Sequence, residues 1–362
     1  MITAERNGIP PSAGRSSRKA SRSRPAASGT AGGRRQVRAA IAGLGVAVPE
    51  TVMTNADFEK FLDTSDEWIT QRTGIRQRRI AAEGQSTATL GTAAARAALA
   101  DAGIGPTDLD LIICATVTPE MIFPATACII QSEIGATDVP AFDLSAACSG
   151  FVYGLSIGSK LIESRMYRRI LVIGVDTLSR FADYTDRASC VIFGDGAGAV
   201  VLDATRRANR GLLYSVLHAD GRGWDYVYVP AGGSRQPATL ETVRDRQHYV
   251  KMRGRDVYKF AVEKLQWLLE HCMAECGLSA DDVDLVVPHQ VNIRIIQSAT
   301  EKLGFPMEKV YLNLDRYGNT SGASIPLAMA SAREAGLLRP GSTVLLVGFG
   351  AGLTWAGAVV RM

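Results

Sequence analysis

The chain has 362 residues, of which 46% are hydrophobic and 36 are glycine, a composition typical of a soluble α/β protein with room for two domain-sized units. No apolar run reaches the length of about 18 residues that a membrane-spanning helix requires, so the sequence excludes such a helix. The net charge of +4 arises in residues 1–36, which hold eight basic residues and one acidic residue, whereas the rest of the chain holds 32 basic and 35 acidic residues. The mildly acidic body gives no support for a nucleic-acid-binding function.

Residues 1–36 are rich in Ser, Arg, Gly, Ala and Pro, and we expect them to form a disordered basic tail. The tail lacks the apolar stretch of a secretory signal. Three interpretations stay open: a solvated bacterial extension, an organellar transit peptide, or an arm that binds a polyanion or a membrane surface. Six cysteines in so long a chain, most of them within apolar runs, are typical of reduced core cysteines. We therefore expect a cytoplasmic protein, with organellar import as the alternative.

The body begins with a buried strand over residues 38–48, which ends at Pro49. A short helix follows over 54–61, and a second helix begins where Ser65 or Asp66 can cap its first turn. The further expected elements, in chain order, are a helix over 86–102, a strand over 109–117, a helix over 125–134, a helix over 151–162, a strand over 169–175 and an apolar segment over 191–202 that closes the first half.

This pattern occurs twice along the chain. Residues 102–117 align with 276–291, residues 170–175 with 344–349, and residues 197–201 with 356–360. Three matches in the same order indicate two similar α/β halves, 37–208 and 209–362, that pack together as one body. The alignment places His289 at the carboxyl end of a buried strand, where open α/β sheets bind ligands.

Cys148 lies between a short strand and an apolar helix, in the sequence Ser145-Ala-Ala-Cys-Ser-Gly150. Small neighbours leave room for a substrate at the sulfur. A helix N-terminus favours the thiolate through its unpaired N–H groups and its dipole. Taken alone, a small buried core cysteine is the simpler interpretation.

Three other features could serve chemistry, and each also has a structural explanation. His289 could be a satisfied core histidine, and Asn319 could be a turn residue. The glycine-rich turn after Val347 could bring backbone N–H groups close to a ligand oxygen. His271, Cys272 and Cys276 make an incomplete metal site, so we expect no metal.

Jointly, Cys148, His289, Asn319 and the Phe349-Gly-Ala-Gly352 turn resemble the condensing enzymes of the thiolase superfamily, and specifically the β-ketoacyl-acyl-carrier-protein (ACP) synthase III family. The resemblance covers about residues 37–362 and rests on Thr64-Ser-Asp-Glu-Trp-Ile-Thr-Gln-Arg-Thr-Gly-Ile-Arg76, Ala146-Ala-Cys-Ser-Gly150, Phe193-Gly-Asp-Gly-Ala-Gly-Ala199, Pro288-His-Gln-Val-Asn-Ile-Arg294 and Gly318-Asn-Thr-Ser321. It implies an α/β, thiolase-like fold of two duplicated halves in αβαβα layers. The asparagine of the last motif disfavours the relatives that use a cysteine, a histidine or a glutamate as the third catalytic group.

The resemblance implies decarboxylative condensation of an acyl-CoA primer with malonyl-ACP to give 3-oxoacyl-ACP, which initiates fatty acid biosynthesis without a cofactor. Cys148 would carry the acyl group as a thioester. The backbone N–H groups of Cys148 and Ala351 would form the oxyanion hole, although glycine is common at the second position. His289 and Asn319 would stabilise the enolate.

The resemblance also implies residues that contact the substrates and a partner subunit of a homodimer. The expected contacts are Trp68 and Arg187 around the CoA adenine, Arg72 at its phosphates, Asn292 along the pantetheine channel, Lys259 and Arg294 at acidic ACP, and Phe123 reaching across the dimer interface into the partner's acyl pocket.

Other functions stay open. A starter-unit ketosynthase of a secondary-metabolite pathway would use the same residues. A papain-like cysteine hydrolase has the same order Cys148, His289, Asn319, but its local cysteine signature is absent and the duplicated halves argue against it. An inactive scaffold tethered by the tail is disfavoured by the complete triad. Acetyl, branched and longer primers all remain possible.

We predict that deletion of residues 1–36 leaves turnover unchanged, because the tail contributes no residue to the resembling motifs. Steady-state rates of the truncated and full-length chains provide the measurement. A large loss of turnover would show that the tail belongs to the site.

Overall fold

A computed structural model describes residues 37–207 and 209–362, and the expected basic tail lies outside the described residues. Its helices are α1 (Asn55–Glu59), α2 (Asp66–Thr73), α3 (Thr87–Ala102), α4 (Thr126–Ile134), α5 (Gly150–Glu163), α6 (Leu240–Arg244), α7 (Gly254–Cys276), α8 (Ile293–Leu303), α9 (Leu314–Tyr317) and α10 (Ser324–Glu334). Its strands are β1 (Arg38–Ala47), β2 (Val52–Thr54), β3 (Gln77–Arg79), β4 (Leu111–Ala115), β5 (Ala141–Leu144), β6 (Arg169–Thr177), β7 (Asp195–Thr205), β8 (Gly211–Ala219), β9 (Val227–Tyr228), β10 (Lys251–Met252), β11 (Leu285–Pro288), β12 (Thr343–Gly350) and β13 (Thr354–Arg361). Two short 3₁₀ turns, η2 (Ala147–Ser149) and η6 (Ser321–Ala323), precede α5 and α10.

Two main sheets repeat the same topology. The first has the strand order β1-β7-β6-β4-β5, and the second has the order β8-β13-β12-β11. Strands β4 and β6 of the first sheet are parallel, and so are the equivalent strands β11 and β12 of the second. The following pairs are antiparallel: β6 with β7 and β7 with β1 in the first sheet, and β12 with β13 and β13 with β8 in the second. The strands of the first sheet all precede residue 208, and those of the second all follow it. The aligned segments of the sequence therefore occupy equivalent places in the two sheets.

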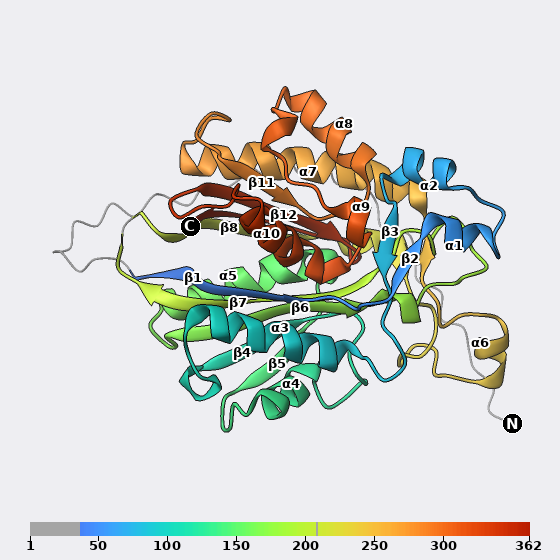
Figure 1. Ribbon diagram of the computed structural model, residues 1–362, viewed down its shortest axis with the longest axis horizontal. Coiled ribbons are helices and arrows are strands. Elements are labelled where there is room, and N and C mark those ends of the chain that lie inside the picture. Colours follow the sequence, from blue (N-terminus) through green and yellow to red (C-terminus); the bar gives the residue numbers. More distant parts are fainter. Residues whose placement is uncertain (1–36, 208) are drawn as a thin grey trace, which may run out of the picture. The chain divides into compact units, whose positions relative to one another are not determined.

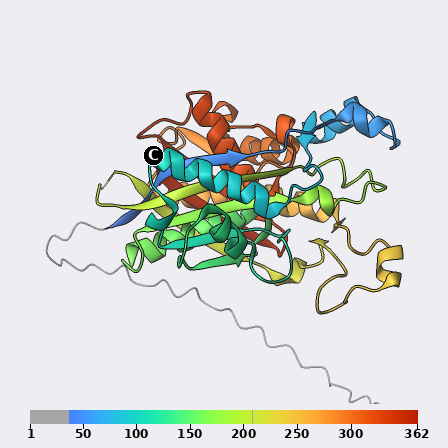
Figure 2. The same ribbon diagram turned by 60° about the horizontal axis from the view of Figure 1, so that its bottom comes forward.

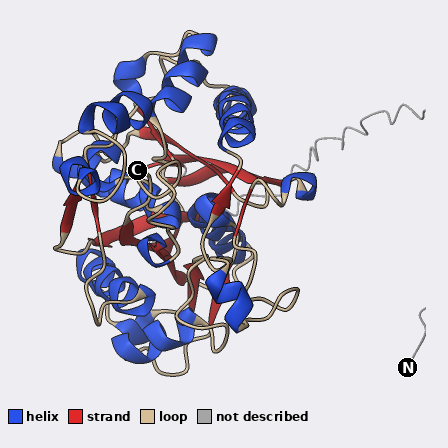
Figure 3. Ribbon diagram, turned by 90° about the vertical axis from the view of Figure 1, so that its right-hand side faces the viewer, coloured by secondary structure: helices blue, strands red, loops and turns tan. Residues whose placement is uncertain are grey.

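The elements form five layers (Figure 1 and Figure 3). Helices α3 and α4 cover the outer face of the first sheet, which comes forward in Figure 2. Helices α5 and α10 lie between the sheets, and α7 and α8 cover the outer face of the second sheet. The expected α/β fold with αβαβα layers is confirmed.

The central strands are apolar at successive positions because both of their faces are covered. In β4, Ile113 packs against the helices between the sheets, whereas Ile112 packs under α3 and α4. In β12, Leu346 and Leu345 divide in the same way between the central and outer layers. Side chains of a strand alternate between its faces, so two buried faces require a continuous apolar run.

The two halves meet where backbones cross at glycine. A methyl group on Gly174 of β6 would overlap the carbonyl oxygen of Gly322 in η6. At the equivalent crossing, a methyl on Gly348 of β12 would lie 3.0 Å from Ser149 Cα in η2. Glycine is needed at position 174 because no side chain fits between the crossing backbones, and at position 348 it allows the equivalent backbones to approach closely.

Most predicted elements are present, with shifts at their ends. Ser65 caps α2 by accepting from Trp68 N, as the sequence predicted. The apolar segment over 191–202 coincides only partly with a strand, because β7 begins at Asp195 and continues to Thr205. The cysteines are also less uniformly buried than expected: Cys128 is exposed, Cys148 and Cys276 are half-buried, and all six are free. Within the described residues, no helix is long and apolar enough to cross a membrane.

Candidate active site

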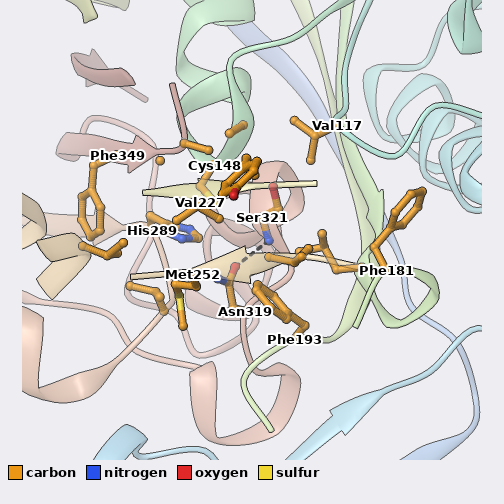
Figure 4. Close-up of a pocket in the computed structure, with 18 of the residues that line it drawn as sticks. Val117, Cys148, Phe181, Phe193, Val227, Met252, His289, Asn319, Ser321 and Phe349 are labelled. Carbon is orange, nitrogen blue, oxygen red and sulfur yellow. Dashed lines mark hydrogen bonds between the residues drawn. The ribbon is translucent and has the colours of Figure 1, made fainter. Parts of the chain in front are cut away.

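Cys148 is the middle residue of η2, where the chain passes from β5 into α5. The preceding Ala147 has φ +46°, a left-handed conformation that is uncommon for a residue with a side chain. Cys148 lines a pocket that His289 and Asn319 also line (Figure 4). The sharp turn thus presents a cysteine from the first half to two polar residues of the second half.

Strand β12 runs directly against this turn because it has glycine at the contact. A methyl group on Gly350 would lie 2.7 Å from Cys148 N and 3.1 Å from Cys148 Cβ. Ala351, the next residue, lines the same pocket as Cys148. The close approach brings the backbone of the glycine-rich turn beside the backbone of the cysteine.

Two hydroxyl groups that sequence reasoning missed fasten these turns together. Thr354 Oγ1 lies 3.0 Å from Ala146 O and 3.0 Å from Ala351 O, so it joins the cysteine turn to the glycine-rich turn. Ser149 Oγ lies 2.7 Å from Ala146 O and 2.8 Å from Thr354 Oγ1. The residues are 205 positions apart, and only the place of Ser149 beside Cys148 and of Thr354 shortly after the glycine-rich turn could have drawn attention to them.

His289 follows the last residue of β11, at the strand end that the sequence duplication predicted. Its backbone N–H donates to Val347 O over 2.8 Å, and its ring packs edge-on against Phe349 with centroids 5.5 Å apart. Burial lowers the pKa of His289 from 6.5 to about 3, so the imidazole is neutral at neutral pH. Nδ1 is buried and has no partner among the described residues. Since a buried unpaired N–H costs more than an unpaired lone pair, the proton is better placed on Nε2.

Asn319 is held in place by the first half of the chain. Its N–H donates to Ile192 O over 2.9 Å, and its carbonyl accepts from Gly194 N over 2.9 Å. Its side-chain Oδ1 accepts from Ser321 N over 2.8 Å, shown as a dashed line in Figure 4. Because Oδ1 is already engaged, the Nδ2 donors are the part of the amide left for the pocket.

The pocket has a cavity volume of about 310 Å³ and an apolar lining. Most of its side chains are aliphatic or aromatic, and Figure 4 shows them around the polar end formed by Cys148, His289, Asn319 and Ser321. The lining comes from both halves and includes Val117, Leu178, Phe181, Phe193, Val250, Met252 and Phe260. A cavity of this kind suits an acyl chain whose carbonyl end lies at the sulfur.

The expectation that Cys148 favours the thiolate is corrected by its surroundings. Burial is the largest cause that raises its pKa, to about 12, and the negative charge of Asp176 acts in the same direction. The nearby hydroxyl of Ser321 and the backbone N–H of Cys148 act in the opposite direction on this pKa without overcoming burial. The resting group is therefore a neutral thiol.

Three of the expected CoA-binding residues lie together at the surface. Arg187 lies over the indole ring of Trp68, with its guanidinium carbon 5.3 Å from the ring centroid, and Arg72 lies 4.9 Å from the same centroid. Arg187 also bonds to Asp63, through its backbone oxygen and its carboxylate. An adenine ring entering between Trp68 and Arg187 would have to separate this closed pair.

The remaining expected contact residues lie outside the pocket lining of this chain. Asn292 caps α8 and donates from Nδ2 to Arg72 O over 2.9 Å, so its amide joins α8 to the end of α2. Lys259 on α7 and Arg294 on α8 are exposed on neighbouring helices. Phe123 is 82% exposed, and the cavity of this chain does not include it.

Within the part of the chain that the structure describes, no cluster of three or more His, Cys, Asp or Glu side chains could hold a metal ion. His271 Nε2 instead hydrogen-bonds Tyr214 Oη over 2.9 Å.

Comparisons with known proteins agree with one another. The sequence pattern of 3-oxoacyl-[acyl-carrier-protein (ACP)] synthase III matches residues 142–221, and that of its C-terminal part matches residues 273–362. The chain is 50% identical to the beta-ketoacyl-[acyl-carrier-protein] synthase III of Caldanaerobacter subterraneus, over 90% of this chain and 98% of the relative. It superposes on the crystal structure of 3-oxoacyl-[acyl-carrier-protein] synthase III from Aquifex aeolicus with a TM-score of 0.83 and 42% identity, covering 90% of this chain and 100% of that one. The priming beta-ketosynthase of the R1128 polyketide pathway gives a TM-score of 0.82 and 34% identity, covering 91% and 97%.

The neutral state of His289 predicts a pH dependence of stability. The unfolded chain binds the imidazole proton with a pKa near 6.5, but the folded chain binds it only near 3. The unfolded state therefore gains protons first as pH falls below 6.5. The free energy of unfolding should drop by about 1.4 kcal/mol between pH 7.5 and 5.5 through this residue. Urea unfolding of the native chain and of the His289→Gln variant isolates the contribution of His289 to this pH dependence, because all other groups titrate in both proteins. Equal pH dependence in the two proteins would show that His289 is not held neutral.

Proposed function

The chain belongs to the β-ketoacyl-[acyl-carrier-protein] synthase III family, and we propose that Cys148, His289 and Asn319 perform its reaction. The reaction joins an acyl-CoA primer to malonyl-ACP and gives 3-oxoacyl-ACP, the first condensation of fatty acid biosynthesis. The observation that carries the residue assignment is the meeting of these three side chains, from two halves of the chain, at the polar end of one apolar cavity.

The first half-reaction transfers the primer to the enzyme. The sulfur of Cys148 forms a bond to the acyl carbonyl carbon, the carbon–sulfur bond to CoA breaks, and the thiol proton ends on the departing CoA sulfur. The cavity beside the sulfur receives the acyl chain. Because the resting thiol is neutral, the site must stabilise the thiolate only while the transfer takes place.

The oxyanion of the tetrahedral intermediate needs two N–H donors. We assign these to the backbones of Cys148 and Ala351, which line the cavity side by side. The close contact of Gly350 with Cys148 supports this assignment. Ala351 retains its backbone N–H, so the alanine does not remove a donor.

The second half-reaction begins when malonyl-ACP loses carbon dioxide. The electron pair of the broken carbon–carbon bond develops as an enolate, whose oxygen accepts from His289 Nε2–H and Asn319 Nδ2–H. Each preorganised donor contributes about 3 kcal/mol to stabilising this charge. The carbanion then forms a carbon–carbon bond to the thioester carbonyl and expels the thiolate of Cys148. Since His289 stays neutral above about pH 3, it can donate to the enolate throughout the physiological range.

CoA binding is assigned to the surface cluster of Trp68, Arg72 and Arg187. Aromatic and cationic groups suit the adenine and phosphates of CoA. Asn292 joins this cluster through Arg72 O and could turn toward pantetheine only by leaving its cap position. Lys259 and Arg294 present positive charge that suits acidic ACP. We propose a cytoplasmic location, with organellar import as the alternative.

A homodimer is supported by an unpaired sheet edge and an apolar loop. Strand β5 forms the edge of the first sheet, and its Phe142 is 39% exposed. Ile122 and Phe123, in the loop between β4 and α4, are each 82% exposed. Pairing of two β5 edges would cover this surface and bring Phe123 to the partner's acyl pocket.

Priming of a secondary-metabolite pathway is the second candidate, because the R1128 priming ketosynthase shares the fold at 34% identity. The higher identity of 50% to a β-ketoacyl-ACP synthase III favours fatty acid biosynthesis. A papain-like hydrolase and an inactive scaffold are not supported by any relative described above.

Replacement of the three residues should separate the half-reactions. Cys148→Ala should abolish formation of the acyl-enzyme, because it removes the nucleophile. His289→Ala and Asn319→Ala should form it but lose decarboxylation by a factor of about 10²–10³ each, because each lacks one donor. Intact-mass measurement after exposure to a panel of acyl-CoA primers detects the adduct and identifies the preferred primer, and carbon dioxide release measures decarboxylation.

Cys276→Ala and His271→Ala are matched controls, since both side chains lie on α7 away from the cavity lining, and they should behave like the native chain. An acyl adduct on the Cys148→Ala protein would overturn the assignment of the nucleophile.

The dimer is tested by sedimentation velocity at micromolar concentration. The native chain should sediment as a species with twice the chain mass of 38.6 kDa. Phe123→Asp should shift the population toward the monomer, because burial of a charge at the interface is unfavourable. Leu240→Asp, at an exposed position on α6, should leave the mass unchanged. A monomeric native chain would contradict the proposal.

A further inference from the structure

Ser321 in the second half is equivalent to Ala147 in the first half, the residue directly before Cys148. It is the first residue of η6, as Ala147 is the first residue of η2, and both turns lead into the central helices. Ser321 has φ +50° and Ala147 has φ +46°, so both adopt the left-handed conformation that side chains disfavour. The η6 turn is therefore a counterpart of the cysteine turn and meets it in the middle of the molecule.

The hydroxyl group of Ser321 is buried at the reacting sulfur. The residue is only 1% exposed, yet it lines the same cavity as Cys148 (Figure 4). Its backbone N–H is engaged with Asn319 Oδ1, but its Oγ has no aligned hydrogen-bond partner among the described residues. Burial raises the pKa of both the Cys148 thiol and the Asp176 carboxyl, and Ser321 Oγ lies close enough to each group to act against that rise. A strained, buried and unaligned hydroxyl between two groups that can carry negative charge needs a functional explanation.

Asp176 does not need this hydroxyl to be satisfied. Its Oδ1 accepts from four donors on the loop after β4, namely Thr116 Oγ1 at 3.0 Å, Val117 N at 2.8 Å, Thr118 N at 3.1 Å and Thr118 Oγ1 at 3.0 Å. Its Oδ2 accepts from Gly322 N at 3.1 Å. The carboxylate thus fixes η6 against the first sheet without a hydrogen bond from the Ser321 hydroxyl.

We propose that Ser321 is a further catalytic residue, whose hydroxyl donates its O–H to the sulfur of Cys148 while that sulfur is a thiolate. When the acyl group is on the sulfur, a thioester sulfur is a poor acceptor, and the hydroxyl turns to Asp176 instead. The same donor returns to the sulfur when condensation expels the thiolate. No covalent bond to Ser321 forms. The inference rests on the proposed role of Cys148 as the nucleophile.

The need for this donor follows from the groups that face the sulfur. The sulfur of Cys148 faces Asp176 on β6, whose negative charge disfavours a second negative charge nearby. From the end of β11 it faces His289, which is neutral and belongs to the enolate step. Neither group stabilises the thiolate, whereas a hydroxyl donor does so without adding a permanent charge to the apolar cavity.

The test measures the reactivity of the Cys148 thiol against pH in the full-length chain. Iodoacetamide is the probe, and mass mapping of the Cys148 peptide separates it from the exposed Cys128. Ser321→Ala should lower the alkylation rate constant at pH 7.5 about tenfold and move the pH profile upward by about one unit, because loss of a charge-assisted hydrogen bond lowers the fraction of thiolate. Formation of the acyl-enzyme should slow by a similar factor.

Two further variants separate the hydroxyl from the fold. Ser321→Gly also lacks the hydroxyl but relieves the left-handed backbone, and it should lose reactivity as Ser321→Ala does. Ser324→Ala removes a buried hydroxyl three residues away that pairs with Thr320 within the described part of the chain, and it should keep the native pH profile. Thermal unfolding of each variant shows whether the fold is retained.

An unchanged pH profile in both Ser321 variants would overturn the inference. So would a loss of reactivity in Ser321→Ala that Ser321→Gly restores, because the backbone rather than the hydroxyl would then be responsible. An acyl adduct that maps to a residue other than Cys148 in the native chain would instead overturn the proposed function itself.

Discussion

The crossing of the two halves at glycine is the constraint on which the site depends. Gly348 and Gly350 let β12 touch the cysteine turn, and Gly174 lets β6 touch the η6 turn. These contacts are between backbones, so any side chain there would push the halves apart. Because the cysteine comes from one half and the histidine and asparagine from the other, the contact distance between the halves sets the geometry of the reaction.

Burial then decides which charges the site can hold. The cavity lining is apolar, and both titratable groups at its polar end rest neutral: the thiol of Cys148 because burial raises its pKa, and the imidazole of His289 because burial lowers its pKa. Such a site favours hydrogen-bond donors over permanent charges. In the proposed reaction, donors would stabilise the negative charge that moves from thiolate to oxyanion to enolate, and no ion pair would have to be broken.

The duplicated topology divides the work between equivalent places. His289 follows β11, whereas Ala115 ends β4 at the equivalent position, and the loop after β4 binds Asp176 instead. The turns η2 and η6 share a left-handed first residue, but one holds the nucleophile and the other a hydroxyl. The equivalent positions thus differ, with the proposed acyl carrier in the first half and the proposed donors in the second.

Local pattern determined the element order and the duplication, whereas the three residues of the proposed triad were indicated only by the resemblance of their motifs to the synthase III family. Apolar runs, caps and aligned segments are short-range signals, and the motifs around Cys148, His289 and Asn319 are contiguous in the chain. Only the tertiary structure decided that the thiol rests neutral and that Arg187 closes over Trp68. It also decided that Ser149 and Thr354 fasten the two turns, and that Ser321 and Asp176 lie at the sulfur. These properties arise from burial and from contacts between residues far apart in the chain, which no local pattern encodes.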